Sequence, residues 1–142
     1  MTSPVPLLAS LAVRDAVLAV LLADQPLADL VQGVLDYVPE DQAYPYIHLG
    51  DVVETPANSH DRFGSETLLN LSIWSKYRGF AQGLTIATRV RQALDHAPLQ
   101  IEGHRWTWTR FVSLQTLTDP EPPGDIRHLP IAFRIGSEVD PV

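Results

Sequence analysis

The sequence predicts an α+β protein in which helices cover one face of a mostly antiparallel sheet. In residues 66–96, a strand with alternating apolar residues passes through a glycine into an amphipathic helix. The predicted elements run helix, strands, helix, strands, an order typical of this class. The length of 142 residues suits a single hydrophobic core, so we expect one domain over residues 1–142.

The first predicted element is a helix rich in Ala and Leu, which have high helix propensity. Ser3 is the expected N-cap and Pro4 the first helical residue, and the helix runs to about Leu22. Its apolar surface extends more than halfway round, so we expect one side to cover the sheet and the other to contact a partner subunit. Arg14 and Asp15 interrupt the apolar run, which argues against a signal peptide. The eight apolar residues that follow are too few for a membrane span, which takes roughly 20.

The next predicted elements are a helical turn at residues 26–30, a brief strand at 33–38 and an extended segment at 44–55. Pro45 places the start of that segment at an edge or entry position. We expect a kink or bulge at Gly50, because glycine within a strand often marks one. The polar segment 56–65 is long for a hairpin loop, and such loops often carry function.

In the strand of residues 66–96 the apolar residues are Leu69, Leu71 and Ile73. Gly79, between strand and helix, is expected to adopt backbone angles that other residues avoid. The expected apolar stripe of the helix comprises Phe80, Leu84, Ala87, Val90 and Leu94.

After this helix, residues 99–101 and 104–114 predict a strand pair around a turn at Glu102 and Gly103. The residues expected to share one face of the second strand are Trp106, Trp108, Arg110 and Val112. A second long loop, TDPEPPGD at 118–125, precedes the last strand. The apolar residues of that strand are Leu129, Ile131, Phe133 and Ile135.

The composition excludes several classes of function. With 10 Lys and Arg against 17 Asp and Glu, the net charge of -7 disfavours a protein that binds nucleic acid over a broad surface. The chain has no cysteine, which excludes disulfides, thiolate metal sites and cysteine nucleophiles. Neither a glycine-rich phosphate loop nor the elbow G-x-S-x-G is present. We expect no catalytic residue and no cofactor.

The histidines lack the spacing of a metal-binding motif, so no metal site is predicted. The five are His48, His60, His96, His104 and His128. An alternative interpretation is a small metal- or ligand-binding enzyme domain with a pocket between helices and sheet that uses His48, His60 or His104.

Tryptophan and arginine are the strongest candidates for protein contacts, because both are enriched at interface hot spots. Trp106 and Trp108 fit either the core or an interface. A subunit interface is expected to include the exposed side of the helix at 79–96 or the face near Trp74. The candidate interface residues are Arg62, Phe63, Trp74, Arg78, Arg89, Trp106 and Arg110.

Several motifs occur in a characteristic order. They are YPYIHLGD, a long polar loop, LNLSIWSKYRGFAQGLTIATRVRQALDH, an L-x-I-x-G turn at 99–103, a WTR strand and HLPIAFRI. This order resembles the tail terminator or tail-completion proteins of long-tailed, siphophage-like bacteriophages and of phage-like gene transfer particles. The positions that match the family pattern, all of them fold determinants, are Pro45, Tyr46, Leu49, Gly50, Trp74, Ser75 and Leu94.

The resemblance implies a structural protein of the virion tail or neck that assembles in the host cytoplasm and is not an enzyme. It also implies a homohexameric ring that terminates the tail tube and joins it to the head-side connector. Its partners would be other copies of itself, the major tail tube protein and the connector or stopper protein, with no membrane involved. DNA would pass through the lumen without specific binding, as the acidic composition allows. Another ring of the neck, a stopper or an adaptor, remains an alternative.

Overall fold

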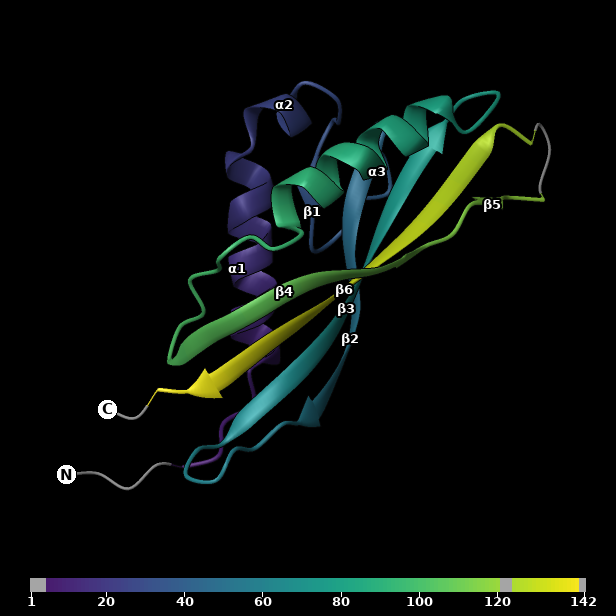
Figure 1. The fold of residues 1–142 in the computed structure, drawn as a ribbon. Coiled ribbons are helices and arrows are strands. Elements are labelled where there is room, and N and C mark those ends of the chain that lie inside the picture. Colours follow the sequence, from purple (N-terminus) through teal and green to yellow (C-terminus); the bar gives the residue numbers. More distant parts are fainter. Residues whose placement is uncertain (1–4, 121–123, 141–142) are drawn as a thin grey trace.

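The computed structural model describes residues 5–120 and 124–140 of the chain (Figure 1). The elements are α1 (Ser10–Ala23), α2 (Gln25–Ala28), β1 (Val34–Leu35), β2 (Tyr46–Pro56), β3 (Gly64–Lys76), α3 (Ala81–Leu94), β4 (His104–Leu114), β5 (Leu117–Thr118) and β6 (Ile126–Val139). The predicted α+β class is confirmed.

The strands form one strongly twisted sheet in the order β1-β2-β3-β6-β4 (Figure 1). β5 pairs with the start of β6, on the same edge of β6 that pairs with β4 from Ile131 onward. The pairing of β1 with β2 is parallel, and the other pairings in the described part of the chain are antiparallel. The longest strands, β3 and β6, pair along the whole of β3, so the sheet is a long ribbon.

The helices cover one face of this sheet. α1 contacts β1, β2 and β3, and α3 contacts β3, β6 and β4. The sheet residues buried beneath them are Ile47, Leu49, Leu69, Leu71, Ile73, Leu129, Ile131, Phe133 and Ile135. The predicted alternation of β3 and β6 is therefore confirmed, and the opposite face, which we call the open face, carries the side chains between these positions.

α1 begins at Ser10, so the predicted start near Pro4 is wrong. Ser3 and Pro4 themselves lie outside the described residues. The reason for the later start is that the N–H groups of Ala9 and Ser10 donate to the carboxylate of Glu54 on β2, at 3.0 and 2.9 Å. A side chain distant in sequence thus satisfies the first free N–H groups of the helix, a role that a local N-cap often fills.

β2 has the predicted irregularity at Gly50, where its register with β3 shifts between Leu49 and Val52. A Cβ atom at Gly50 would lie 2.7 Å from the carbonyl oxygen of Asn70. Glycine is required here because the neighbouring backbone comes too close for a side chain. Arg14 of α1 donates to the carbonyl of Gly50 itself, which ties the helix to the bulge.

The prediction of special backbone angles at Gly79 is wrong, since the described glycines with positive φ are Gly103 and Gly124. The chain turns from β3 into α3 without a left-handed residue. A Cβ atom at Gly79 would meet nothing within 4 Å.

The stripe predicted for α3 is partly correct. Ala87, Val90 and Leu94 are buried as expected, but Leu84 is 40% exposed. The helix is rotated because it approaches the sheet at Gly83, where a Cβ atom would lie 2.6 Å from Leu129. The buried residues of α3 are therefore Gly83, Ile86, Ala87, Val90 and Leu94.

β4 pairs with β6 and not with residues 99–101, so the predicted strand pair is wrong. Residues 99–101 form no strand, and Leu99 and Ile101 pack into the core from a loop. A bulge between Trp106 and Trp108 also breaks the alternation of β4. As a result, the structure puts these two side chains on opposite faces of the sheet, against the expectation that they share one.

Candidate functional site

A row of aromatic rings crosses the open face of the sheet. Trp74 on β3 stacks on His128 of β6, with ring centroids 4.0 Å apart and planes 3° from parallel. Tyr46 of β2 pairs with Trp74 in the ladder, and its ring lies 5.2 Å from that of Tyr44. We call Tyr44, Tyr46, Trp74 and His128 the aromatic row. Such rings offer a rigid, partly apolar surface to a partner.

The environment of the row changes its ionisable groups. Burial lowers the pKa of His128, whose Nε2 lies 2.8 Å from the hydroxyl of Ser72. Burial, together with neighbouring Tyr44, raises the pKa of Tyr46. Both effects favour uncharged rings, which makes this part of the open face suited to packing against another protein.

Arginine side chains mark the other half of the open face. The guanidinium of Arg110 lies 5.7 Å from the ring centroid of Trp108. Arg105 and Arg62 both reach the carboxylate of Glu138, at 2.8 and 3.7 Å. This half therefore offers charged and hydrogen-bonding groups where the aromatic row offers flat rings.

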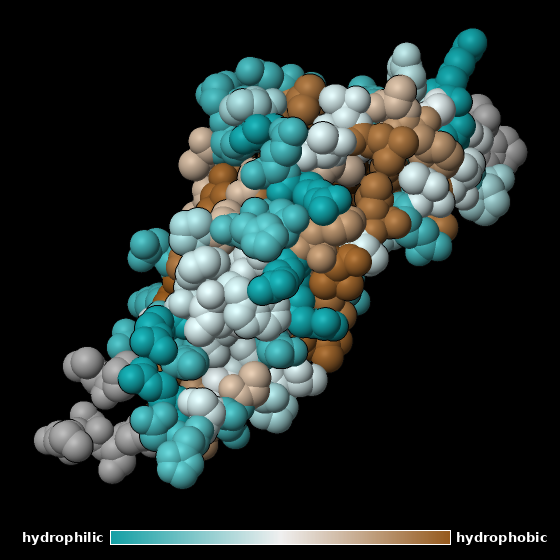
Figure 2. All heavy atoms as spheres, in the orientation of Figure 1, coloured by the Kyte–Doolittle hydropathy of each residue, from teal (hydrophilic) through white to brown (hydrophobic). Residues whose placement is uncertain are grey.

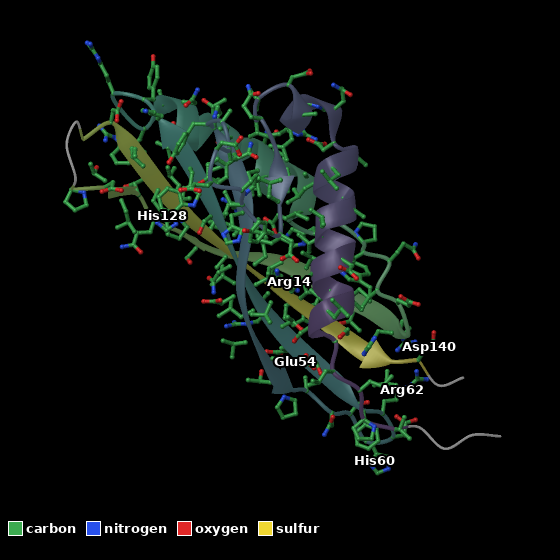
Figure 3. All side chains as sticks on the ribbon, turned by 180° about the vertical axis from the view of Figure 1, so that it is seen from behind. Arg14, Glu54, His60, Arg62, His128 and Asp140 are labelled. Atoms are coloured by element: carbon green, nitrogen blue, oxygen red, sulfur yellow. The ribbon has the colours of Figure 1, made fainter. Side chains whose placement is uncertain are left out.

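The long predicted loop between β2 and β3 lies at one end of the ribbon. Ser59 and Arg62 form a small bridge within it, and Asn58 accepts a hydrogen bond from the N–H of Gly64 at 3.1 Å. Figure 3 shows His60 and Arg62 at this tip and His128 toward the opposite end of the molecule. Arg62 and the aromatic row therefore lie toward opposite ends of the ribbon.

An apolar groove of about 430 Å³ runs between α3 and β4. Its main lining residues are Leu84, Thr88, Arg91, Phe111, Leu114 and Ile131. The guanidinium of Arg91 lies 4.3 Å from the ring centroid of Phe111, and its Nε donates to Asp95 at 3.3 Å. Figure 2 shows hydrophobic residues gathered between α3 and the neighbouring strands β4 and β5.

The polar rim of this groove is fixed. Burial of Asp95 opposes its ionisation, but hydrogen bonds from the Phe111 N–H and from Arg91 outweigh burial and lower the pKa of its carboxyl. Asp95 is therefore an anion that holds α3 against β4, and it leaves part of the Arg91 guanidinium facing outward.

Two of the candidate interface residues, Arg89 and Trp106, make side-chain hydrogen bonds within the molecule. Arg89 donates to Asp24 at 2.8 and 2.7 Å, joining α3 to the start of α2, and this contact lowers the pKa of Asp24. Trp106 packs against the core and donates from Nε1 to Thr109 at 2.8 Å. Contacts of Arg89 and Trp106 with a partner stay a prediction. The geometry supports them less than it supports a partner contact by Trp74.

The other candidates lie nearer the surface. Arg78 is exposed just after β3, and Arg110 is exposed on β4. Phe63 and Arg62 are half-buried in the loop between β2 and β3. The sequence indicated Trp74 but missed the other members of the aromatic row and the groove, because both features depend on which strands and helices are neighbours.

Two histidines of the enzyme interpretation make separate structural contacts, and the third, His60, is exposed in the loop between β2 and β3. His48 contacts the carbonyl of Asp36 at 3.1 Å, and His104 contacts that of Glu102 at 2.8 Å. Within residues 5–120 and 124–140, no group of three or more His, Asp or Glu side chains could hold a metal ion. None of the helices described is long and apolar enough to cross a membrane.

Comparison with known proteins gives a consistent result. The family model of "Tail completion protein gp17" matches residues 15–138. The tail completion protein gp17 of Bacillus phage SPP1 is 32% identical over 114 residues, which is 80% of this chain and 84% of the relative.

The solved structures agree with the sequence match. A chain in the virion of a native gene transfer agent particle superposes with a TM-score of 0.79 at 25% identity, covering 92% of this chain and 97% of that one. The structure of bacteriophage SPP1 gp17 gives a TM-score of 0.63 at 27% identity, covering 89% of both chains. The chain therefore belongs to the tail completion protein gp17 family, whose members are structural components of the phage tail and not enzymes.

Proposed function

We propose that this protein forms a homohexameric ring that terminates the tail tube and joins it to the head-side connector during assembly in the host cytoplasm. The observation that carries the proposal is the separation of two loops by the β3–β6 ribbon. The loop before β3 adjoins the Gly64 and Glu138 pair, whereas the connection into β6 adjoins the Lys76 and Ile126 pair. The 13 residues of β3 lie between them, a distance of roughly 40 Å.

This separation suits a protein that joins two different structures. If the ribbons of the subunits stand side by side around the ring, one set of loops faces the tube and the other faces the connector. The tube protein and the connector would then contact different residues of the same chain, and neither contact would obstruct the other.

The open face supports the same function. Its aromatic row and the side chains of Arg105 and Arg110 offer contact surfaces, while the helices occupy the other face. The net charge of -7 fits a lumen through which DNA passes without binding, because like charges repel.

The test is to add the purified protein to polymerising major tail tube protein and to measure tube lengths by electron microscopy. We expect the protein to sit on tube ends as a ring, to stop elongation and to shorten the length distribution as its concentration rises. Light scattering of the tube-end complex, after release from the tube, is expected to give a hexamer.

A loop variant and two possible outcomes separate the proposal from its alternatives. A variant with residues 58–61 replaced by Gly and Ser tests whether the loop before β3 is needed, with Glu102→Gln as an unrelated surface change. A protein that binds the connector and leaves tube length unchanged would favour a stopper or adaptor. A strict monomer without effect on tubes would contradict the ring altogether.

A further inference from the structure

α1 exposes an apolar line that has no cover in the described part of the chain. Leu11 and Leu22 are 71% and 59% exposed, and Leu18 between them is half-buried. The one charge on the line is Asp15, an exposed carboxylate. We call Leu11, Asp15, Leu18 and Leu22 the α1 ridge. Their spacing of four, three and four residues puts them on one side of the helix.

The side of α3 that borders the groove has the same spacing. Leu84, Thr88, Arg91 and Asp95 also follow each other at four, three and four residues. The first and last residues of each series lie eleven positions apart, or roughly 16 Å along a helix. The exposed leucine of this series is Leu84, and its cation is Arg91, whose side chain is 57% exposed.

The two surfaces lie toward opposite flanks of the molecule. α1 packs over β1, β2 and β3, whereas α3 packs over β3, β6 and β4, at the other side of the sheet order. Figure 2 shows brown surface beside α1 and, separately, between α3 and the strand of β4 and β5. A ridge on one flank and a groove on the other cannot meet within one copy, but they can meet between copies in a head-to-tail arrangement. Closed rings are built from such heterologous contacts.

We propose that the α1 ridge of one subunit docks into the α3 groove of the next, with the two helices antiparallel. In this register Leu22 faces Leu84, Leu18 faces Thr88, Asp15 faces Arg91 and Leu11 faces Asp95 of the neighbour. The occupant of the groove is thus a second copy of this chain, a conclusion that rests on the proposed ring.

Charge complementarity selects the direction of the docking. The antiparallel register places the only carboxylate of the ridge on the only cation of the α3 series. A parallel register would put Asp15 on Thr88 and would set Leu18 and Leu22 against Arg91 and Asp95. Two leucines would then cover charges, against one, Leu11 over Asp95, in the antiparallel register, and covering a charge with an apolar side chain is unfavourable.

Cysteine cross-linking tests the contact directly, because the chain has no cysteine of its own. Asp15→Cys protein is mixed with Arg91→Cys protein and oxidised, alone and on tail tube ends. We expect a disulfide-linked dimer from this mixture. The matched control replaces Arg91→Cys by Val53→Cys, an exposed position on β2, and should give little cross-linking.

Charge reversal gives a second readout. Asp15→Arg and Arg91→Asp should each weaken self-association by about 3- to 10-fold, and the double variant should recover most of it. Thermal unfolding of each variant checks that Arg91→Asp folds despite its lost contact with Asp95.

The outcomes separate this proposal from the ring itself. Rings on tube ends without the cross-link between positions 15 and 91, or with no recovery in the double variant, overturn the docking and leave the ring intact. Absence of both rings and cross-link contradicts the proposed function as well.

Discussion

The carboxylate of Glu54 accepts a hydrogen bond from the hydroxyl of Ser10 at 2.6 Å, although 44 residues separate the two in the sequence. The same carboxylate accepts from the N–H of Ala9 and from the hydroxyl of Ser65, at 3.0 and 2.7 Å. A single side chain thus joins the start of α1 to β2 and β3 (Figure 3). The negative charge also lies at the N-terminal end of the helix, where the helix dipole favours it.

Glu54→Gln is expected to lower the free energy of unfolding by about 1 to 2 kcal/mol, because it replaces hydrogen bonds to a charged group by weaker ones. Urea unfolding followed by tryptophan fluorescence measures the change. Glu102→Gln, an exposed carboxylate outside any helix, is the matched control and should have little effect. Equal stabilities of the two variants would show that the carboxylate does not hold α1.

The same contact predicts an acid-sensitive stability. Burial alone would raise the pKa of Glu54, but hydrogen bonds from Ser10, Ala9 and Ser65 outweigh it and lower the pKa below the ordinary value of 4.5. Since the folded form binds its proton less readily, this contribution is complete above pH 4.5 and is lost as pH falls through the folded pKa. Unfolding free energies measured below about pH 5 should therefore fall less steeply for Glu54→Gln than for the unchanged protein.

Gly50→Ala is expected to destabilise the fold by about 1 to 3 kcal/mol, since its Cβ atom would press on the backbone oxygen of Asn70, which cannot rotate away. Gly79→Ala makes the same chemical change where nothing lies within 4 Å. The difference between the two variants in urea unfolding isolates the close approach at the bulge. Similar losses in both would show that contact with the Asn70 backbone is not the cause.

His128 should titrate below the ordinary histidine value of 6.5, because its buried ring resists protonation. The unfolded chain then takes up the proton first as pH falls, so the free energy of unfolding decreases from pH 6.5 down to the folded pKa. Trp74→Ala removes the stacked ring and should move the pKa of His128 upward. NMR titration of the imidazole protons measures it, with Trp108→Ala as the control.

Local patterns were sufficient wherever one face of an element was buried. The alternation through Leu69, Leu71 and Ile73 predicted β3 and its buried face, because side chains of a strand point to opposite faces in turn. Gly50 predicted the bulge because glycine within a strand often marks a bulge or the close approach of another backbone. The order of the motifs around these residues was also enough to indicate the family.

Predictions failed where a distant contact overrode the local pattern. The start of α1 is set by Glu54, which no window around Ser3 contains. The rotation of α3 follows from the approach of Gly83 to Leu129, a contact between elements. The separation of Trp106 from Trp108 follows from a bulge in β4, whose own residues include no glycine, because the glycine at this place, Gly136, lies opposite on β6.

The α+β class, the two long central strands, the acidic charge and the family can all be read from the amino-acid sequence, since each depends on composition, period or motif order. The contact surfaces, in contrast, become visible only once the chain has folded. The aromatic row forms because β2, β3 and β6 are neighbours in the sheet, and the groove forms because α3 lies beside β4. The physical reason is that a surface joins side chains that are distant along the chain, and only strand pairing and helix packing bring them together.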